Sequence, residues 1–586
     1  MGLLSEREVG IASKVCADRG EPLIKAVRNN PRLTGQDIAT VEARLMHSAR
    51  IDPVTQPPDI RLLDRIVPAE CLRMGVLPWR KMGGQTIVLA AAPPDFAHHL
   101  PTLTDAYGPV RLSIASDDQL KEALRRVSAH SLAQTAERSV PLDQSCRSWQ
   151  GGWLSAATGA LCALGMVGMS ISSNWTITLT FCAIIFWTLA NSLLKLLAIL
   201  AHLFGPMARL SDPAPARLPV VTVMVPLFRE SEIAARLIRR LTALDYPADL
   251  LDICLLLEQD DVLTRTAVAR TNLPRTIRAI VVPTGLVRTK PRALNYGLNF
   301  ARGTIIGVYD AEDAPDPQQI RKIVARFANA SPQVACLQGV LDFYNARRNW
   351  LSRCFALEYA TWFRIVLPGL ERLGLIIPLG GTTLFFRRSV LEKLGGWDAH
   401  NVTEDADLGV RLARNGYRTE LIMTVTGEEA NCRAWPWVKQ RSRWLKGYAI
   451  TYIVHMRQPM RLLRDIGPRR FIGFQVQFLG TLCQFAMAPL LWSLWALPLG
   501  LPHPLASLLP GWGIPAMTAL FIATEAITWT GAALGAHAAG RSWLIPWVPT
   551  LNFYFPLASL AAWKGLVELV HRPFYWDKTS HGQEGH

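Results

Sequence analysis

The sequence has few cysteines, and it spaces them too widely for a paired-thiol site. Ten cysteines are spread over 586 residues, from Cys16 to Cys483, and no two of them form a CxxC pair. Closely spaced cysteine pairs are typical of zinc sites and redox centres. Neither kind of site is therefore indicated, and we expect reduced thiols that face the cytoplasm or pack within a membrane.

The amino terminus lacks the features of a targeting segment. It reads MGLLSEREVG, which is charged and contains no apolar core, whereas a secretory signal requires one. Position 6 is Glu rather than Ser or Thr, so the myristoylation pattern also fails. We expect neither a cleaved signal nor a myristoyl anchor.

Basic residues are in excess, but they do not gather as in a nucleic-acid-binding protein. The chain has 62 Lys and Arg against 46 Asp and Glu, a net charge of +16. Nucleic-acid binders concentrate such charge on one face or in runs. Here the charges are scattered and crowd beside apolar runs, as at residues 461–470. This pattern fits membrane lipid with an anionic inner leaflet and no nucleic-acid partner, although any single charge is equally consistent with a solvated surface.

Two long uncharged runs, residues 153–172 and 175–194, predict a transmembrane hairpin. Each run is about long enough to cross the hydrocarbon core as a helix. Arg147 precedes the pair and Lys195 follows it, while the short connection carries no charge. The positive-inside rule therefore places both ends of the hairpin in the cytoplasm.

The chain becomes apolar again after residue 470. Residues 471–499 and 513–538 each have the length and composition of a span. Residues 543–570 are interrupted by three prolines, and Arg541 before them and the basic tail HRPFYWDK after them both favour the cytoplasmic side. One simple crossing cannot satisfy both, so a re-entrant or surface-lying segment is one solution and the number of spans stays open.

Between these membrane regions, residues 219–455 alternate strand-like and helix-like patterns. The runs VVTVMVPLF, LDICLLLE, IRAIVVP and TIIGVYDA are apolar and rich in β-branched residues, and helical patterns such as residues 231–244 separate them. Such alternation predicts a mostly parallel sheet with crossover helices. In sheets of this kind ligands bind beyond the carboxyl ends of the strands.

Acidic residues follow three of these predicted strands at the point where each strand stops. Taken singly, an acid at a strand end is most often a helix cap or part of a solvated loop. As a set on one sheet edge, they are suited to a divalent cation with a nucleotide base and ribose, because Mg²⁺ and Mn²⁺ prefer oxygen ligands. The set consists of Glu230 after the first strand, Glu258, Asp260 and Asp261 at the end of the second, and Asp310, Glu312 and Asp313 after the fourth.

Further motifs follow in a fixed order. They are Lys290 in TKPRALN, the DxD-like pair Asp310 and Glu312, the loop Gly380-Gly381-Thr382, the triplet Thr403-Glu404-Asp405, and the QxxRW pattern at residues 440–444. QxxRW alone would be a common chance match, whereas DxD, TED and QxxRW in this order are specific. Over residues 219–455 the chain resembles family-2 glycosyltransferases. Within that family it resembles polysaccharide synthases related to bacterial cellulose synthase and to inner-membrane phage-adsorption glycosyltransferases.

The resemblance implies a nucleotide-sugar-binding α/β domain of the glycosyltransferase A type and a role for each matching residue. Asp405 is the expected general base, and Glu404 is expected to hold the acceptor or the local network. Trp444 is expected either to pack against a sugar or to be a core tryptophan. The remaining roles are nucleoside contact for Glu230, Asp260 and Asp261, donor contact for Lys290 and Asp310, Mg²⁺ or Mn²⁺ binding for Asp310 and Glu312, and acceptor or diphosphate contact for Gly381, Thr382, Gln440 and Arg443.

These roles together predict an inverting hexosyltransferase of the bacterial inner membrane, with its catalytic domain in the cytoplasm. It would transfer sugar from a nucleotide donor, a UDP-hexose, to a growing exopolysaccharide, coupled to secretion through a periplasmic or outer-membrane export partner. Transfer of one sugar to a lipid or polyprenyl phosphate is the first alternative. A degenerate receptor or scaffold is the second. Trp492 and Trp495 could line a sugar channel or belong to the interfacial aromatic belt.

The first 140 residues predict a small soluble α/β domain. Helical patterns at residues 38–49, 61–74, 95–107 and 117–127, the last capped by Asp117, alternate with strand patterns at 76–79, 86–91 and 110–115. The string RLLDRIVPAECLRMGVLPWRKMGGQTIVLAAAPPD resembles the amino-terminal domain of type II secretion ATPases, some relatives of which bind cyclic di-GMP. The long Arg-Leu-Gly…Gln repeat of those members is not found, so cyclic di-GMP is a candidate ligand and a docking module is the alternative.

We therefore divide the chain into five parts. They are a soluble α/β regulatory or docking domain at residues 1–140, a transmembrane hairpin at 151–203, the glycosyltransferase domain at 219–455, a second transmembrane region at 470–572, and a tail at 573–586.

Overall fold

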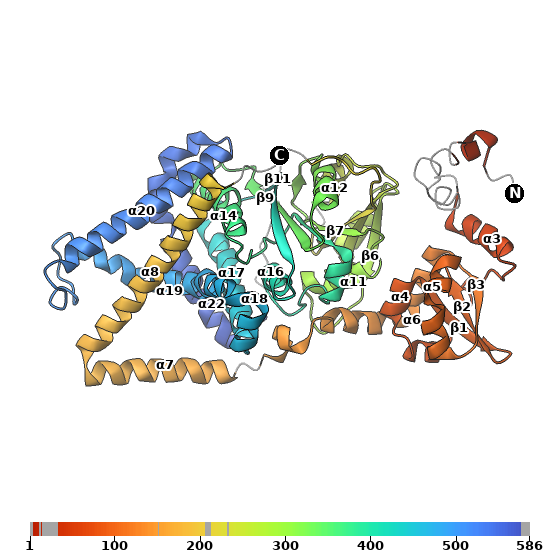
Figure 1. The fold of residues 1–586 in the computed structure, drawn as a ribbon, viewed down its shortest axis with the longest axis horizontal. Helices are drawn as coiled ribbons and strands as arrows, with labels where there is room; N and C mark the ends of the chain where they lie inside the picture. Colours follow the sequence, from red (N-terminus) through yellow and green to blue (C-terminus); the bar gives the residue numbers. More distant parts are fainter. Residues whose placement is uncertain are drawn as a thin grey trace.

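The computed structural model of the protein describes residues 4–10, 13, 33–149, 152–205, 212–230 and 234–575. The molecule is elongated, with three regions along its length (Figure 1). A small α/β unit lies at one end, a large sheet with its helices in the middle, and long helices at the other end. The tail prediction falls mostly on residues 576–586, which lie outside the described residues.

The amino-terminal unit has the predicted order of helices and strands. Its sheet runs β1-β2-β3, with β1 and β2 antiparallel and β2 and β3 parallel. Two details differ from prediction: Pro68 starts a new helix at the middle of residues 61–74, and Ser116 rather than Asp117 caps α6, which runs on to Arg138. The elements are α3 (Gly35–Leu45), η1 (Ile60–Asp64), α4 (Pro68–Met74), β1 (Val76–Met82), β2 (Gln85–Ala90), α5 (Pro93–Tyr107), β3 (Val110–Ile114) and α6 (Asp117–Arg138).

The central region is built on an eight-stranded mixed sheet in the order β6-β5-β4-β7-β10-β9-β11-β8. Strands β4 to β7 are parallel, as predicted, while β10 runs antiparallel between β7 and β9, and β8 antiparallel beside β11. The strands are β4 (Val221–Leu227), β5 (Leu251–Glu258), β6 (Ile277–Val282), β7 (Ile305–Val308), β8 (Ala314–Pro315), β9 (Val334–Phe343), β10 (Leu384–Arg387) and β11 (Arg418–Glu428).

Helices cover both faces of this sheet, which explains why its strands are continuously apolar rather than alternating. Along β4, Met224 packs into one apolar cluster and Val223 and Val225 into another. The first cluster continues through Leu132 and Ala136 of α6 into the amino-terminal unit. The helices are α9 (Ala234–Thr242), α10 (Val262–Ala269), α11 (Lys290–Leu298), α12 (Gln319–Asn329), α13 (Trp350–Thr361), α14 (Leu367–Arg372), α15 (Arg388–Lys393), α16 (Glu404–Arg414) and α17 (Ala434–His455).

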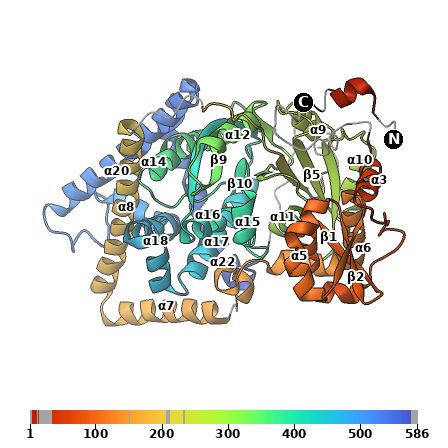
Figure 2. The ribbon, with the colours of Figure 1, turned by 45° about the vertical axis from the view of Figure 1, so that its right-hand side comes forward.

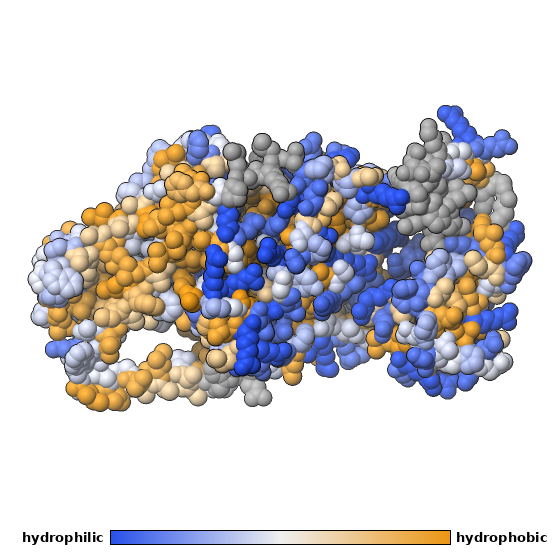
Figure 3. Space-filling model, viewed as in Figure 1, coloured by the Kyte–Doolittle hydropathy of each residue, from blue (hydrophilic) through white to orange (hydrophobic). Residues whose placement is uncertain are grey.

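Four helical segments in the described part of the chain are long and apolar enough to cross a membrane: Leu154–Ile171, Ser173–Phe204, Pro459–Ala496 and Gly513–Ala538. Their apolar side chains gather at one end of the molecule, and polar side chains dominate the rest of the face in view (Figure 3). The segments contain α7 (Gly152–Ile171), α8 (Ser173–Phe204), α18 (Pro459–Phe474), the π-helix η5 (Gln475–Gly480), α19 (Thr481–Ser493), η6 (Leu494–Ala496) and α20 (Gly513–Ala538).

The proline-rich stretch near the carboxyl end is a bent pair of helical pieces. It comprises η7 (Ser542–Thr550), α21 (Leu551–Tyr554) and α22 (Pro556–His571), with a bend of 44°. Just before it, Arg541 Nη1 donates to Asp342 Oδ1 of β9 at 2.8 Å, and just after it the Tyr575 carbonyl accepts from Lys446 Nζ of α17 at 2.8 Å. Both ends therefore contact the central region, which is what the re-entrant or surface-lying solution requires.

The views in Figures 1 and 2 show α7 and α8 as a hairpin that leaves the central region and returns to it. α8 is 32 residues long and extends ten residues beyond the run that predicted it. The helix continues past Lys195, the first charged residue after the predicted run. The Lys195 side chain lies inside the helix bundle, where its Nζ donates to Thr528 Oγ1 of α20 at 3.3 Å.

Candidate functional site

A cavity of about 1060 Å³ opens at the carboxyl edge of the parallel strands. It is lined by Glu230 after β4, Glu258 at the end of β5 and Asp310 after β7. The three strand ends that the sequence predicted to converge therefore do so. Of the other predicted site residues, Lys290, Glu312, Gly381, Thr382, Glu404, Asp405, Gln440, Arg443 and Trp444 all line the same cavity.

Lys290 joins two parts of this site. It is the first residue of α11, and its Nζ donates to Asp310 Oδ1 at 2.5 Å and to the Gly381 carbonyl at 2.7 Å. Burial opposes the charged form, but the nearby carboxylates of Asp310 and Glu404 outweigh it and raise the pKa of Lys290. A fixed positive charge therefore stands between the DxD-like pair and the glycine loop.

Carboxylates crowd one side of the cavity. Burial is the main cause that holds the pKa values of Asp313 and Glu428 well above their usual range. The charges of Asp310 and Glu312 add to it for Asp313, and those of Asp313, Glu312 and Asp310 add to it for Glu428. Asp313 Oδ2 accepts from the Asp310 amide at 2.8 Å, whereas its Oδ1 is buried without a hydrogen-bond partner in the described structure. Both acids therefore favour the neutral form, because burial and the neighbouring acids oppose a further negative charge.

This donor set fits a divalent cation that is completed by a substrate. No group of three or more His, Cys, Asp or Glu side chains among the described residues is arranged as a ready-made metal cage. Mg²⁺ commonly takes only one or two carboxylates and fills its shell with water and substrate phosphates. Asp310 and Glu312 offer that partial shell, and a cation bound there would relieve the repulsion by which they help to raise the pKa of Asp313.

The TED triplet lies at the start of α16. Thr403 is the N-cap residue, and Asp405 Oδ1 accepts from the Ala406 amide at 2.8 Å. Its other oxygen, Oδ2, lies 3.4 Å from the position a Cβ on Gly381 would take, so the glycine leaves open space beside the carboxylate. Burial raises the pKa of Asp405, and burial together with the Asp405 charge raises the pKa of Glu404 to about 7.

The QxxRW residues come from α17. Gln440 Oε1 accepts from Asn431 Nδ2 at 2.8 Å. Arg443 is buried close to Glu404, Asp310 and Asp405, and burial lowers the pKa of its guanidinium below the ordinary value despite these acids. Trp444 lines the cavity and also packs at 6.2 and 6.3 Å between ring centroids with Phe355 and Tyr359. Trp444 is thus partly buried in an aromatic cluster at the cavity wall, and packing against a sugar stays a prediction.

Asp260 and Asp261 lie beside this cavity rather than in its wall. Asp261 caps α10 by accepting from the Thr264 amide at 3.2 Å, and Asp260 forms an ion pair with Arg288, which does line the cavity. Nucleoside contact by these two acids stays a prediction. Sequence reasoning placed Glu258 among the strand-end acids without giving it a role of its own. It missed Glu428, which is the last residue of β11 and could have been found by the same signal.

The cavity continues between the apolar helices. There its wall contains Asn191 and Lys195 of α8, Gln477 of η5, and Glu525 of α20. Gln477 is 5% exposed, and neither atom of its amide has a hydrogen-bond partner within the described residues. Trp492 and Trp495, left open between channel and aromatic belt, also line this part. These four polar side chains, which we call the polar wall, stand among apolar ones such as Phe485 and Leu491, and they carry polar groups from the carboxylates of the sheet edge into the membrane region.

A mixed α/β sheet of the glycosyltransferase A type, with DxD, TED and QxxRW side chains around one cavity at its strand ends, defines a nucleotide-sugar transferase domain. Residues 218–447 match the model of the family described as glycosyltransferase like family 2. Residues 46–134 match the MshEN domain model. The chain therefore carries a family-2 glycosyltransferase domain joined to an MshEN domain.

Curated relatives agree with this assignment. The probable glycosyltransferase YdaM of Bacillus subtilis is 27% identical over 250 residues, covering 42% of this chain and 59% of YdaM. The β-monoglucosyldiacylglycerol synthase of Synechocystis is 28% identical over 323 residues, with 52% and 64% covered. Glucomannan 4-β-mannosyltransferase 7 of Arabidopsis thaliana is 25% identical over 243 residues, with 40% and 43% covered. The chain spans less than two thirds of each relative's length.

Proposed function

We propose that the protein is a membrane-bound inverting hexosyltransferase that adds sugar from a nucleotide donor, a UDP-hexose, to a growing polysaccharide. The observation that carries the proposal is the single cavity that joins the DxD, TED and QxxRW side chains to the polar wall between the membrane helices. A nucleotide sugar at one end and a sugar chain at the other would both find polar surface there.

In this reaction Asp405 takes the proton from the acceptor hydroxyl while that oxygen attacks the anomeric carbon. The bond from the anomeric carbon to the diphosphate oxygen breaks on the opposite face, which inverts the configuration and releases the nucleoside diphosphate. Burial raises the pKa of Asp405 towards the working pH, which suits a general base. Glu404, the other acid of the TED triplet, orients the acceptor.

Positive groups around the diphosphate stabilise the leaving group. Lys290 and Arg443 are two of the cationic side chains that line the cavity, both close to the Asp310 and Glu404 carboxylates, and Arg443 can make a bidentate contact. Asp310 and Glu312 would hold Mg²⁺ or Mn²⁺, which supplies further neutralisation of the diphosphate. Gly381, Thr382, Gln440 and Trp444 form the acceptor side, and Glu230, Asp260 and Asp261 the nucleoside side.

The acceptor is a carbohydrate in this proposal, and a lipid is the alternative. One relative is named as a glycolipid synthase and another as a polysaccharide mannosyltransferase, so names alone do not choose. The polar wall favours the carbohydrate, because the hydroxyls of a sugar chain can pair with a buried amide such as Gln477, which would otherwise remain unsatisfied.

The membrane arrangement supports a cytoplasmic catalytic domain in a bacterial inner membrane. Arg541 and the four arginines of residues 461–470 lie at the ends of the apolar segments that face the catalytic sheet, as the positive-inside rule requires of the cytoplasmic side. We propose the five-part division given above, with export of the product through a periplasmic or outer-membrane partner.

The MshEN domain is proposed to bind cyclic di-GMP and to regulate the transferase. The full-length protein, titrated with cyclic di-GMP and followed by calorimetry and thermal shift, should show saturable heat and a raised melting temperature. Absence of both signals would leave a docking role for this domain.

The central test is a donor screen on purified protein in detergent that follows nucleoside diphosphate release and product size together. We expect one UDP-hexose to be consumed and to give a polymer. Asp405→Asn should lower kcat by about 10²- to 10⁴-fold with the fold intact, since general-base catalysis contributes that much. Full activity of this variant would refute the assignment of Asp405 as the base. In the donor screen, a lipid that carries one sugar would establish the alternative acceptor. Inactivity with every donor would support a degenerate scaffold.

A further inference from the structure

The segment that leaves the MshEN domain lies against two loops of the transferase domain. We call residues 136–146 the linker segment; they comprise the end of α6 and the turns that follow it. The donor loop, residues 284–289, carries Arg288 and leads to Lys290. The base loop, residues 395–403, leads to Glu404 and Asp405. These two loops deliver the groups proposed to hold the donor and to deprotonate the acceptor.

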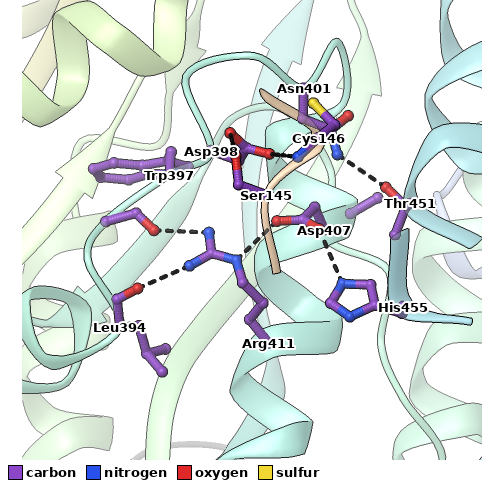
Figure 4. Close-up of polar contacts among 12 residues, drawn as sticks. Ser145, Cys146, Leu394, Trp397, Asp398, Asn401, Asp407, Arg411, Thr451 and His455 are labelled. Atoms are coloured by element: carbon purple, nitrogen blue, oxygen red, sulfur yellow. Dashed lines mark hydrogen bonds and ion pairs between the residues drawn. The ribbon is translucent and has the colours of Figure 1, made fainter. Parts of the chain in front are cut away.

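At one end, the linker segment is bound to the base loop through Asp398. Ser145 Oγ donates to Asp398 Oδ1 at 2.9 Å, and the Cys146 amide donates to Asp398 Oδ2 at 2.8 Å (Figure 4). Ser145 and Asp398 are each 1% exposed. Hydrogen bonds to a buried carboxylate are strong, and losing one leaves charge that water cannot reach.

From Asp398 a continuous set of contacts reaches the start of α16. The Asn401 amide donates to the Asp398 carbonyl at 3.1 Å, and Asn401 Oδ1 accepts from the Thr403 amide at 3.0 Å. Asn401 Nδ2 also donates to Thr451 Oγ1 of α17 at 3.2 Å, which Figure 4 shows. Thr403 directly precedes Glu404, so the position of Ser145 is transmitted to the helix end that carries the base.

At its other end, the linker segment is bound to the donor side. Asn295 Nδ2 of α11 donates to the Ala136 carbonyl at 2.9 Å and to the Trp397 carbonyl of the base loop at 2.7 Å. Glu137 Oε1 accepts from the Val287 amide at 3.3 Å, next to Arg288 in the donor loop. Glu137 is 4% exposed and so is held within the interface.

The backbone of the linker segment also touches the base loop directly. A Cβ added to Gly395 would lie 2.3 Å from the Ser139 carbonyl oxygen, and Gly395 has a φ of +77°. Only a glycine permits both this conformation and this approach. The contact leaves no room for the linker segment to move without displacing residues that lead to the base.

We propose that the linker segment positions both loops, so that the MshEN domain controls donor binding through Glu137 and placement of the base through Ser145. This inference rests on the proposed transferase function for the meaning of the two loops. Glu137 and Ser145 are positioning residues, because each acts through a loop and neither lines the catalytic cavity.

The test compares full-length variants by separating kcat from the KM for donor. Ser145→Ala should lower kcat about tenfold, as loss of one buried charge-assisted hydrogen bond allows, and leave the donor KM unchanged. Glu137→Ala should raise the donor KM and leave kcat unchanged, while Glu137→Gln, which keeps the acceptor for the Val287 amide, should restore it. Ser131→Ala, at an exposed serine of α6, is the matched control.

Amide hydrogen exchange gives a readout that does not depend on activity. Ser145→Ala should speed exchange in peptides covering residues 395–405, and Glu137→Ala in peptides covering 284–289, each without a change in the other. Two outcomes overturn the proposal. In the first, the Ser145 and Glu137 variants match Ser131→Ala in both kinetics and exchange. In the second, they lower kcat, melting temperature and exchange protection together throughout the chain. If the wild-type protein transfers no sugar, the transferase assignment fails, and the exchange pattern still decides whether the linker segment holds these loops.

Discussion

The close packing of Gly447 against Thr403, beside the proposed base, gives a quantitative prediction. α17 crosses the start of α16 at Gly447, where an added Cβ would lie 2.1 Å from Thr403 Oγ1 and 2.4 Å from its Cγ2. Ordinary van der Waals contact begins near 3.4 Å, so Gly447→Ala requires Thr403 to retreat by about 1.3 Å or the helices to separate by a similar amount. Thr403 directly precedes Glu404 and Asp405.

A displacement of this size at the base is large for catalysis. Misplacing a reacting group by about 1 Å can cost about 10²-fold in rate, which corresponds to about 2.7 kcal/mol of transition-state stabilisation. We therefore expect Gly447→Ala to lower kcat by about 10²-fold with a much smaller change in the donor KM, because the donor residues Lys290 and Asp310 do not contact Gly447. Steady-state release of nucleoside diphosphate measures both constants.

A second substitution separates this mechanism from general damage to the fold. Thr403 makes no side-chain cap for α16, and its Oγ1 has no hydrogen-bond partner in the described structure. Thr403→Ala should therefore be mild alone and should restore part of the activity to Gly447→Ala, because it removes the two nearest of three clashing atoms and leaves only the Cβ of residue 403, 2.7 Å from the added Cβ. Gly159→Ala, at a helical glycine with open space around it, is the control. A Gly447→Ala enzyme at the wild-type rate, or a double variant as slow as the single one, would refute the reasoning.

Three further predictions concern pH, the cation and the membrane half of the cavity. Burial raises the pKa of Glu371 to about 7, whereas the unfolded chain loses this proton near pH 4.5. The free energy of unfolding therefore decreases as the pH rises from about 4.5 to about 7. Glu371→Gln should then stabilise the protein at pH 8, by up to about 3 kcal/mol of unfolding free energy, and not at pH 4.5. The melting temperature measured at both pH values checks this, and equal shifts at the two values would contradict it. Chelation of divalent cations should abolish transfer, and Mg²⁺ or Mn²⁺ should restore it, whereas unchanged turnover in chelator would remove the cation from the proposal. Gln477→Leu should shorten the products seen by mass spectrometry while leaving donor hydrolysis intact, and products of normal length would exclude a role for this amide.

The strand-end acids show what local sequence patterns can predict. Continuous apolar runs identified β4, β5 and β7 as buried strands, and parallel strands bring their carboxyl ends to one edge. The meeting of Glu230, Glu258 and Asp310 around one cavity follows from those two facts. The antiparallel strand β10 was not foreseen, because four residues between a loop and the short helix α15 carry too little periodicity to be distinguished from a turn.

Contacts between distant segments could not be predicted in the same way. Ser145 and Asp398 are separated by 253 positions, and the sequence around each is ordinary for a turn. Gly447 lies within a helix, where a glycine is usually only a weak helix former. The reason for each residue appears only when α16, α17 and the linker segment are placed together, because sequence periodicity reports which face of an element is buried and not what covers it.

The same argument applies to the end of the transferase domain. The sequence prediction ended this domain at residue 455, ahead of the basic residues at 461–470 and the apolar region after them, yet α17 is bound from the membrane side by α22. Lys446 of α17 is fully buried, and its Nζ donates to Glu568 Oε2 at 2.9 Å. A Cβ on Gly565 of α22 would lie 2.8 Å from the Ser442 carbonyl, so the two helices are in close contact beside the QxxRW residues. Removing α22 would take away the carboxylate that pairs with Lys446 in this interface, and breaking a buried ion pair is strongly destabilising. The helix that carries Gln440, Arg443 and Trp444 therefore belongs structurally to the membrane region as much as to the sheet, and the transferase site depends on its membrane segments for more than anchoring.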